Sequence, residues 1–223
     1  MNVESKQLKK QFGKNLIINE NLSKYNWFNL GGPADIFFRP ENKNQLKDFL
    51  KKIQKFNIKI NVIGAGSNTL IRDSGIKGAV IKLGSKFSQI KLISENVIEV
   101  GAATLDRKVS DFAKENNISG MEFLSCIPGS VGGAIIMNSG CYGSEISQIL
   151  YSIVVLDRCG KEKELKRDEI EFMYRGSNIS EEYLILSAKL TGSLSSKELI
   201  TKKREELIRK KKISQPSRIK TGG

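Results

Sequence analysis

The chain lacks histidine entirely among its 223 residues. This absence excludes a histidine general base and histidine metal ligands, so any catalysis must come from a cofactor or from arginine, lysine, tyrosine, cysteine or carboxylate side chains. Cysteine is scarce, because only Cys126, Cys141 and Cys159 are present, and they have no metal-ligand spacing. This usage predicts a reduced, cytoplasmic protein with no metal site.

Long apolar runs are absent as well. No segment approaches the roughly 20 apolar residues that a transmembrane helix needs, and residues 1–6 lack the apolar core of a signal peptide. Apolar residues make up 39% of the chain and charged residues 27%, which are ordinary values for a globular protein. We therefore expect one large domain or two small ones, with no membrane partner.

Arginine is also scarce relative to lysine. The net charge is +13, but the 37 basic residues comprise 28 lysines and 9 arginines. Nucleic-acid recognition favours arginine forks and interleaved aromatic residues, so we predict no nucleic-acid partner. The densest basic stretch, residues 202–212, predicts a helix with a solvated basic face and a Ser195-x-x-Glu198 capping box. Its expected apolar face consists of Leu199, Ile200, Leu207 and Ile208.

The spacing of apolar residues predicts alternating helices and strands of an α+β or mixed α/β protein. Amphipathic helices are expected over residues 42–56, capped by Asn42, and over residues 105–117. The inward face of the second helix is expected to hold Leu105, Val109, Phe112 and Ala113. Strands are expected at residues 58–63, 79–83, 97–100, 153–156 and 183–188, with a turn at 157–160.

The most informative segment, residues 120–146, holds six glycines among apolar residues and almost no charge. So many glycines favour close approach of the backbone to an anionic or flat ligand, although tight turns in a compact core are the alternative. We expect the N–H groups at four positions to hold a phosphate: Gly129, Ser130, Gly132 and Gly133. Ile127, Val131 and Ile135 are expected to form the wall against an aromatic ring.

A second glycine pair follows a predicted strand, in the segment Val62-Ile-Gly-Ala-Gly-Ser-Asn-Thr69. Such a turn is typical of phosphate binding, and an ordinary turn is the alternative. It is not a dinucleotide-binding fingerprint, because Thr69 replaces the third glycine and no acidic residue lies between Asp73 and Glu95. We predict a cofactor-binding loop formed by Gly64, Ala65, Gly66, Ser67, Asn68 and Thr69.

Taken in order, several motifs resemble those of UDP-N-acetylenolpyruvoylglucosamine reductases. They are Gly31-Gly-Pro-Ala34, Gly64-Ala-Gly-Ser-Asn68, Glu122-Phe-Leu-x-x-Ile-Pro-Gly-x-Val-Gly-Gly133, Met137-Asn-x-Gly-x-Tyr-Gly143, Phe172-x-Tyr-Arg-x-Ser177 and Gln215-Pro216. The resemblance runs from about Tyr25 to the last residue. It implies an α+β, two-lobed FAD-binding fold of the vanillyl-alcohol-oxidase type, with the third, substrate-binding domain missing. It implies lobes at residues 1–83 and 84–194, an FAD-binding region of about 27–192, and a basic helix beginning that third domain at 195–223.

The resemblance also implies an activity. Members transfer hydride from NADPH through FAD to UDP-N-acetylglucosamine enolpyruvate, which yields UDP-N-acetylmuramate for peptidoglycan. Arg175 matches the catalytic arginine, and a guanidinium suits the enolate-like charge that develops at the substrate. Tyr174 and Lys212 are expected to contact the nucleotide sugar, although a cation at a helix end is the alternative for Lys212. We expect a monomeric protein.

The sequence departs from the family pattern at several positions. Asn29 replaces a basic residue common in the family, and Cys126 and Cys141 stand where Gly or Ala is usual. The sequence ends before the family's proton-donor serine and distal glutamate. The alternatives are therefore an active reductase, a flavin-binding remnant without reductase activity, and a flavin oxidase or sugar dehydrogenase of the same fold.

Overall fold

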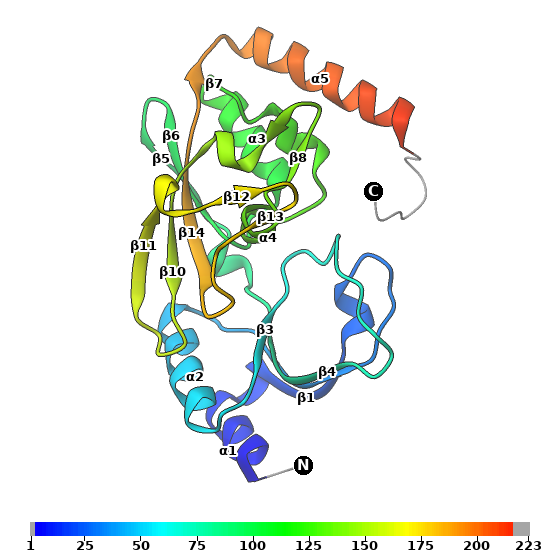
Figure 1. The fold of residues 1–223 in the computed structure, drawn as a ribbon, viewed down its shortest axis with the longest axis vertical. Coiled ribbons are helices and arrows are strands. Elements are labelled where there is room, and N and C mark those ends of the chain that lie inside the picture. The colour runs from blue at the N-terminus through cyan, green and yellow to red at the C-terminus, as the bar shows by residue number, and fades with distance from the viewer. Residues whose placement is uncertain (1–2, 216–223) are drawn as a thin grey trace.

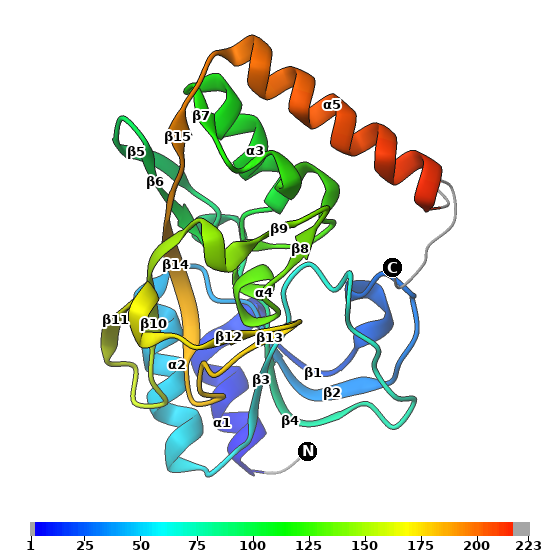
Figure 2. The same ribbon diagram turned by 45° about the horizontal axis from the view of Figure 1, so that its top comes forward.

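A computed structural model describes residues 3–215, which form two main β-sheets with helices packed between and around them (Figure 1). Pro216 and the glycines at the end of the chain lie outside the described residues. Figure 2 shows the longest helix, α5 (Lys197–Ser214), crossing the end of the molecule that is opposite α1 (Val3–Phe12).

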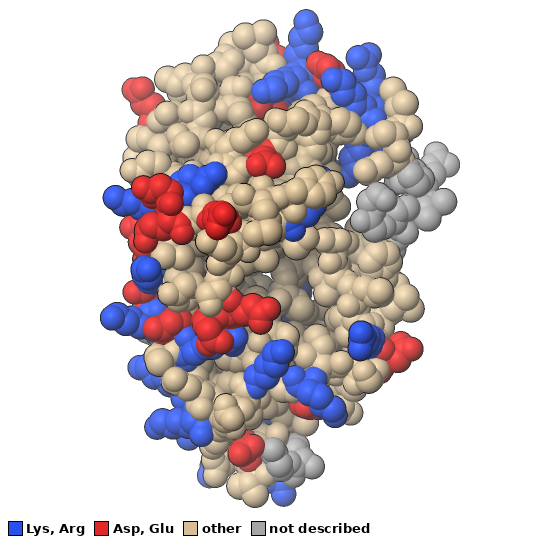
Figure 3. Space-filling model, viewed as in Figure 1, with Lys and Arg blue, Asp and Glu red and all other residues tan. Residues whose placement is uncertain are grey.

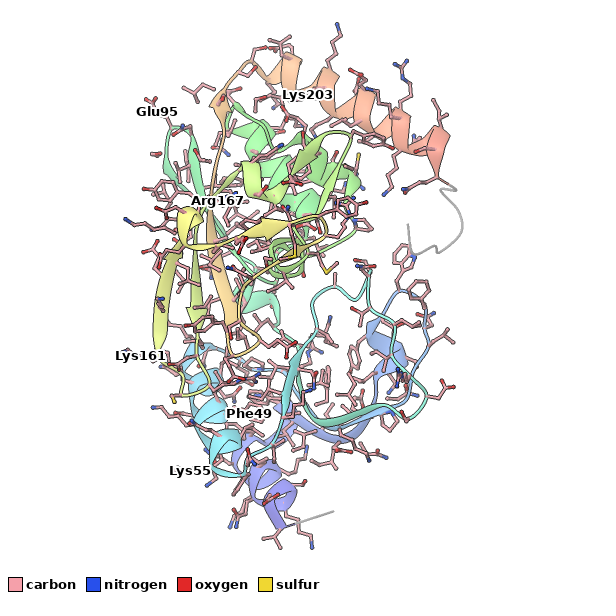
Figure 4. The ribbon with its side chains drawn as sticks, in the orientation of Figure 1. Phe49, Lys55, Glu95, Lys161, Arg167 and Lys203 are labelled. Atoms are coloured by element: carbon pink, nitrogen blue, oxygen red, sulfur yellow. The ribbon has the colours of Figure 1, made fainter. Side chains whose placement is uncertain are left out.

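The first sheet has four strands in the order β1-β2-β4-β3: β1 (Leu16–Asn21), β2 (Pro33–Phe38), β3 (Ile60–Val62) and β4 (Ile76–Ile81). β4 is parallel to β2 and β3, and β1 is antiparallel to β2. Helices α1 and α2 (Lys43–Lys55) cover one face. Phe49 of α2 lies against this sheet (Figure 4), and its ring stacks on Phe38 with centroids 3.9 Å apart.

The second sheet has five antiparallel strands in the order β11-β10-β14-β6-β5: β5 (Ile90–Ser94), β6 (Val97–Gly101), β10 (Leu150–Leu156), β11 (Glu162–Lys166) and β14 (Leu184–Thr191). Three elements bury one face of it: α3 (Asp106–Glu115), the 3-10 helix η4 (Glu122–Cys126) and α4 (Val131–Ile136). Short strand pairs complete this part: β7 (Ile118–Ser119) with β15 (Ser193–Leu194), β8 (Gly140–Cys141) with β9 (Ser144–Glu145), and β12 (Phe172–Met173) with β13 (Gly176–Ser177).

One apolar cluster joins the two sheets. Alternation along β14 turns Leu184 and Leu186 toward α2, where they pack with Leu156 and with the apolar side chains of the first sheet. Ile185, between them, belongs to the cluster on the opposite face of the second sheet. The sheets are therefore held by shared burial, which fixes the loops that project from each.

Most predicted elements are present, with small shifts at their ends. Asn42 caps α2, because its side chain accepts a hydrogen bond from the N–H of Gln45 at 2.9 Å. The turn at 157–160 is confirmed, since Asp157 accepts from the N–H groups of Cys159 and Lys161. The inward position predicted for Leu105 is wrong. α3 begins one residue later, and the Leu105 side chain is 47% exposed.

Helix α5 differs from the prediction in its cap and in its buried face. Ser196, not Ser195, caps the helix by accepting from the N–H of Leu199. Leu199 is 62% exposed, so its predicted place on the apolar face is wrong, whereas Ile200 and Leu207 are buried. Figure 3 shows Lys and Arg gathered along this end of the molecule.

Part of the positive charge of α5 is paired with neighbouring elements. Arg204 is largely buried and donates to Asp111 of α3 at 2.5 Å. Lys203, labelled on α5 in Figure 4, lies 3.3 Å from the buried carboxylate of Glu122. Burial alone would raise the pKa of Glu122, but its bonds with Ser119, the N–H of Gly120 and the nearby lysine leave it lowered. These pairs dock α5 on α3 and η4.

Candidate functional site

A large cleft lies between the two sheets, and Figure 3 shows the face hollowed there. Its volume is about 1360 Å³, above the roughly 300–1,000 Å³ of pockets for drug-sized ligands. Both predicted glycine loops line it, and so does Arg175. All ten residues predicted to bind the cofactor line this one cleft: Gly64, Ala65, Gly66, Ser67, Asn68, Thr69, Gly129, Ser130, Gly132 and Gly133.

The two glycine loops contact each other at one end of the cleft. The N–H of Ala65 donates to Ser130 Oγ at 3.2 Å. A Cβ on Gly64 would lie 2.5 Å from the same oxygen, so the loops approach this closely because Gly64 has no side chain. Lys82 follows directly after β4, and its side chain donates to the carbonyl oxygen of Gly64. This bond holds the first glycine loop, residues 64–69, in place.

The backbone around residue 66 requires a glycine at that position. Its φ of +76° is in the left-handed region, and a Cβ there would lie 2.1 Å from the carbonyl oxygen of Tyr25. The N–H of Trp27 donates to the Gly66 carbonyl at 2.8 Å, which holds residues 25–27 against the loop. Trp27 itself is 40% exposed and lines the cleft.

The second loop departs from the prediction in two ways. The N–H of Gly132 donates to the Ala102 carbonyl at 2.9 Å, so the expectation that it faces a phosphate is wrong. Val131 and Ile135 are fully buried in the core, so they do not form the predicted ring wall. Helical spacing turns Val131 and Ile135 toward the second sheet.

Other residues of this loop do face the cleft. Ile127 lines it as predicted, together with Pro128, Ile136 and Met137. Gly133, in the first turn of α4, also faces it, and the nearest atom to a Cβ there would be 3.9 Å away. The surface around Gly133 therefore combines exposed backbone with apolar side chains. This combination suits a flat ligand that has a charged end.

Asp106 lies directly behind the second loop. Its N–H donates to the Gly129 carbonyl at 3.1 Å, and a Cβ on Gly129 would lie 2.5 Å from Asp106 Oδ2. Both carboxyl oxygens are buried and have no hydrogen-bond partner among residues 3–215, as is also true of Thr104 Oγ1 and Ser110 Oγ nearby in sequence. Burial raises the pKa of Asp106 to about 8. The sequence did not single out Asp106, because an acidic residue is common in the first turn of a helix.

Arg175 lies at the tip of the β12–β13 hairpin. Its φ is +57°, and apart from asparagine and glycine only Arg175 and Tyr142 have positive φ among residues 3–215. Its guanidinium donates to the Gly140 carbonyl at 3.1 Å. The hairpin is tied to neighbouring elements by Ser177, which donates to the Ile136 carbonyl at 3.1 Å, and by Asn138, which donates to the Met173 carbonyl at 3.2 Å. The strained tip therefore has a supported base.

Lys212 and Tyr174, the two predicted substrate contacts, lie differently with respect to the cleft. Lys212 is exposed near the end of α5 and lines the cleft. Tyr174 is 86% exposed and is not among the residues that line the cleft within the described chain. The Arg175 guanidinium lies 5.0 Å from the centre of its ring, so Tyr174 contacts the arginine that does line it.

Several basic side chains line the cleft although the sequence did not predict them as site residues. They are Arg39, Lys59, Lys82, Arg107, Arg158 and Lys211. Burial, and then the charge of Arg39, lowers the pKa of Lys82, so these two cations lie close together. The available signal was a basic residue directly after an apolar strand, as in Arg39 after β2 and Lys82 after β4. Their charge favours an anionic ligand.

Comparison with known proteins agrees with this geometry. A sequence model of an FAD binding domain matches residues 34–166. A UDP-N-acetylenolpyruvoylglucosamine reductase of Pelagibacter ubique is 41% identical over 99% of this chain and 72% of its own length. The chain belongs to the UDP-N-acetylenolpyruvoylglucosamine reductase family. The family role is that of an FAD-dependent oxidoreductase of peptidoglycan synthesis.

Solved structures establish the fold of this family member. The reductase of Thermus caldophilus superposes with a TM-score of 0.79 at 30% identity, over 93% of this chain and 72% of that one. p-Cresol methylhydroxylase superposes with a TM-score of 0.61 at 14% identity and shows the fold alone. The predicted FAD-binding fold of the vanillyl-alcohol-oxidase type is therefore confirmed. Within residues 3–215, no helix is long and apolar enough to cross a membrane.

Proposed function

We propose that the chain binds FAD in this cleft and, as part of a reductase, uses NADPH to convert UDP-N-acetylglucosamine enolpyruvate to UDP-N-acetylmuramate. One observation carries the proposal: the ten residues predicted from two distant glycine loops converge on a single large cleft. The FAD domain match over residues 34–166 supports the cofactor. NADPH, a monomeric state and a cytoplasmic location are parts of the proposal that depend on the family role.

The residues that line the cleft match the two chemical parts of FAD, its pyrophosphate and its flavin ring. A pyrophosphate needs N–H groups or cations, and the cleft offers the open backbone at Gly133 together with the cations Arg39 and Lys82. A flavin ring needs a flat apolar wall, and Pro128, Ile136 and Met137 supply apolar surface. The residues present therefore fit the group. When bound, FAD would supply hydride transfer between NADPH and the enolpyruvyl carbon.

We assign the charge-stabilising role to Arg175. Hydride addition to the enolpyruvyl alkene builds negative charge toward the substrate carboxylate, and a guanidinium in a fixed position stabilises that charge. The bond to the Gly140 carbonyl and the supported hairpin keep Arg175 in place at the cleft. We assign the nucleotide-sugar contacts to Lys212 and Tyr174, of which Lys212 is the one that lines the cleft.

A second candidate is a flavin-binding chain that does not complete the reaction. The chain spans 72% of the lengths of the Pelagibacter and Thermus relatives. Under this candidate, the proton-donor serine and the distal glutamate that the family resemblance implies belong to the part of those relatives that this chain does not match. A missing general acid typically costs a factor of roughly 100 to 10,000 in rate. Under this candidate, the chain would hold FAD and would consume NADPH and oxygen without forming UDP-N-acetylmuramate.

The two candidates are separated by three measurements on the purified 223-residue chain. Flavin absorbance in the purified protein tests cofactor binding and is expected in both cases. NADPH consumption with and without the enolpyruvyl substrate, followed by a product assay, then distinguishes reductase turnover from futile reoxidation. A chain that folds and is colourless after incubation with FAD would contradict both.

A further inference from the structure

Two cysteine side chains lie in the wall of the cleft, outside the residues assigned to flavin or substrate. Cys126 ends η4 and is 6% exposed, and Cys141 ends β8 and is half-buried. Both line the cleft. Cys159 is exposed in the turn between β10 and β11, so it provides a reference thiol in the same chain.

The fold brings the two cleft thiols together. Cys141 Sγ donates to the carbonyl oxygen of Phe123 at 3.5 Å. Phe123 precedes Cys126 by three residues in a 3-10 helix, where residues three apart lie above one another, so this contact brings Cys141 to Cys126. Burial, and then the neighbouring thiol of Cys126, raises the pKa of Cys141 to about 12, against the charges of Lys211 and Arg175.

The backbone at each cysteine is held in place. Cys141 precedes the two-residue turn of the β8–β9 hairpin, in which Tyr142 and Gly143 have φ of +52° and +84°. Arg175 donates to the carbonyl of the preceding residue, Gly140, at 3.1 Å. On the other side, Lys211 donates from α5 to the Cys126 carbonyl at 2.7 Å. The two neighbouring cysteines are consequently positioned by elements that are fixed independently of each other.

We propose that Cys126 and Cys141 are a redox-active pair that an oxidised low-molecular-weight disulfide converts to an intramolecular disulfide in the cleft wall. The Cys126 thiol loses its proton to water, and its thiolate attacks one sulfur of the small disulfide, whose S–S bond breaks and releases one thiolate, which takes up a proton. Cys141 then loses its proton to water and attacks the Cys126 sulfur, expelling the second thiolate, which also takes up a proton. Two protein thiols and one small disulfide become one protein disulfide and two small thiols.

The bond would close a loop that contains the whole second glycine loop and α4. A cross-link of this span restricts the unfolded chain, so oxidation is expected to raise the melting temperature, on the order of 5 °C. The same loop includes Gly140, whose carbonyl accepts the Arg175 hydrogen bond. The oxidised form therefore has a stiffer cleft wall. This reaction uses no flavin and is independent of the proposed reductase activity.

The test uses the purified chain, incubated folded with oxidised glutathione and then alkylated. Trypsin leaves Cys126 and Cys141 together in the peptide 115–158, because no lysine or arginine lies between residues 114 and 158, and it places Cys159 in a separate peptide. Oxidation is expected to yield peptide 115–158 lighter by two hydrogens and resistant to alkylation. Cleavage after Met137, which lies between the two cysteines, should leave the fragments joined until they are reduced.

Matched variants complete the experiment. Cys159→Ser should retain the disulfide and the reversible rise in melting temperature, whereas Cys126→Ser and Cys141→Ser should lose both. Cys126→Ala replaces Cys126→Ser if the buried hydroxyl prevents folding. The proposal is overturned if the folded chain keeps two free thiols at 126 and 141 while Cys159 is glutathionylated. It is also overturned if glutathione stays attached to either cleft cysteine, or if the disulfide involves Cys159.

Discussion

Ala65 and Ser130 are 65 residues apart in sequence, yet the N–H of Ala65 donates to Ser130 Oγ at 3.2 Å. This bond connects the loop after β3 of the first sheet with the loop before α4, the helix that packs on the second sheet, so it links the two halves of the molecule at the cleft. The same serine has no capping bond to its own helix. Ser130 therefore serves the contact between the loops, in place of the local cap that its position would suggest.

Ser130→Ala is expected to weaken FAD binding with a modest loss of stability. Removing the hydroxyl leaves the Ala65 N–H without this partner, which costs about 1 kcal/mol, a factor of roughly five to ten in an equilibrium constant. Fluorescence titration with FAD measures the affinity, and thermal unfolding measures the stability. Ser139→Ala is the control, because Ser139 also lines the cleft but belongs to neither glycine loop. An unchanged FAD affinity in Ser130→Ala would contradict the role assigned to this contact.

Gly133→Val is expected to abolish flavin retention while the chain still folds. The new side chain meets no protein atom nearer than 3.9 Å at its Cβ and projects into the cleft, so it blocks the ligand. The measurement is the flavin-to-protein absorbance ratio after purification with added FAD, together with circular dichroism.

Gly66→Val is the comparison for that substitution. It should also lose flavin, but through damage to its own loop, because its Cβ would lie 2.1 Å from the Tyr25 carbonyl oxygen and its φ is positive. We therefore expect a lower melting temperature for Gly66→Val and an almost unchanged one for Gly133→Val. Stoichiometric FAD in folded Gly133→Val would remove this surface from the cofactor site.

Arg175→Lys is expected to lower turnover by about a hundredfold or more and to leave FAD binding intact. Lysine retains the charge but loses the planar, fixed guanidinium that donates to Gly140 at the supported hairpin. The assay is product formation by a chimera in which the C-terminal part of the Pelagibacter relative follows this chain, with the unsubstituted chimera as reference. Arg167→Lys is the control, because Arg167, labelled in Figure 4, lies over the Phe172 ring of the same hairpin, with its guanidinium 4.7 Å from the ring centre. Equal turnover in Arg175→Lys would remove Arg175 from the mechanism.

The folding stability is expected to fall as pH rises from about 4 to about 8. Burial raises the pKa of Asp106 to about 8 in the folded chain, against 3.8 normally, so the folded state binds the extra proton within this window. The stability then decreases by at most about 1.4 kcal/mol per pH unit and levels off above the folded pKa.

Asp106→Asn tests this dependence. The substitution removes the titrating group, so the variant should lose this part of the pH slope in urea unfolding measured from pH 4 to pH 9. Asp48→Asn, at an exposed position on α2, is the control for the loss of one carboxylate. A slope unchanged by Asp106→Asn would show that the carboxyl finds a partner in solution.

The short-range pattern of the sequence determined much of the fold. Apolar spacing predicted α2, α3 and the central strands, and Asn42 and Asp157 predicted a cap and a turn, because these features depend on residues within one or two turns of each other. The two glycine-rich loops were predicted as well, since glycines in an apolar segment are explained by backbone geometry alone. The capping residue of α5 was misplaced by one position, because adjacent serines carry the same local signal.

Tertiary structure decided what each loop residue does. The Gly132 N–H bonds to Ala102, and Val131 and Ile135 face the second sheet, because strands brought in from elsewhere in the chain occupy those directions. The contact of Ala65 with Ser130 and the burial of Asp106 behind Gly129 depend on how the sheets pack. A residue's own neighbours in sequence fix its backbone tendencies, whereas its hydrogen-bond partners and its exposure are set by elements that only the folded chain brings together.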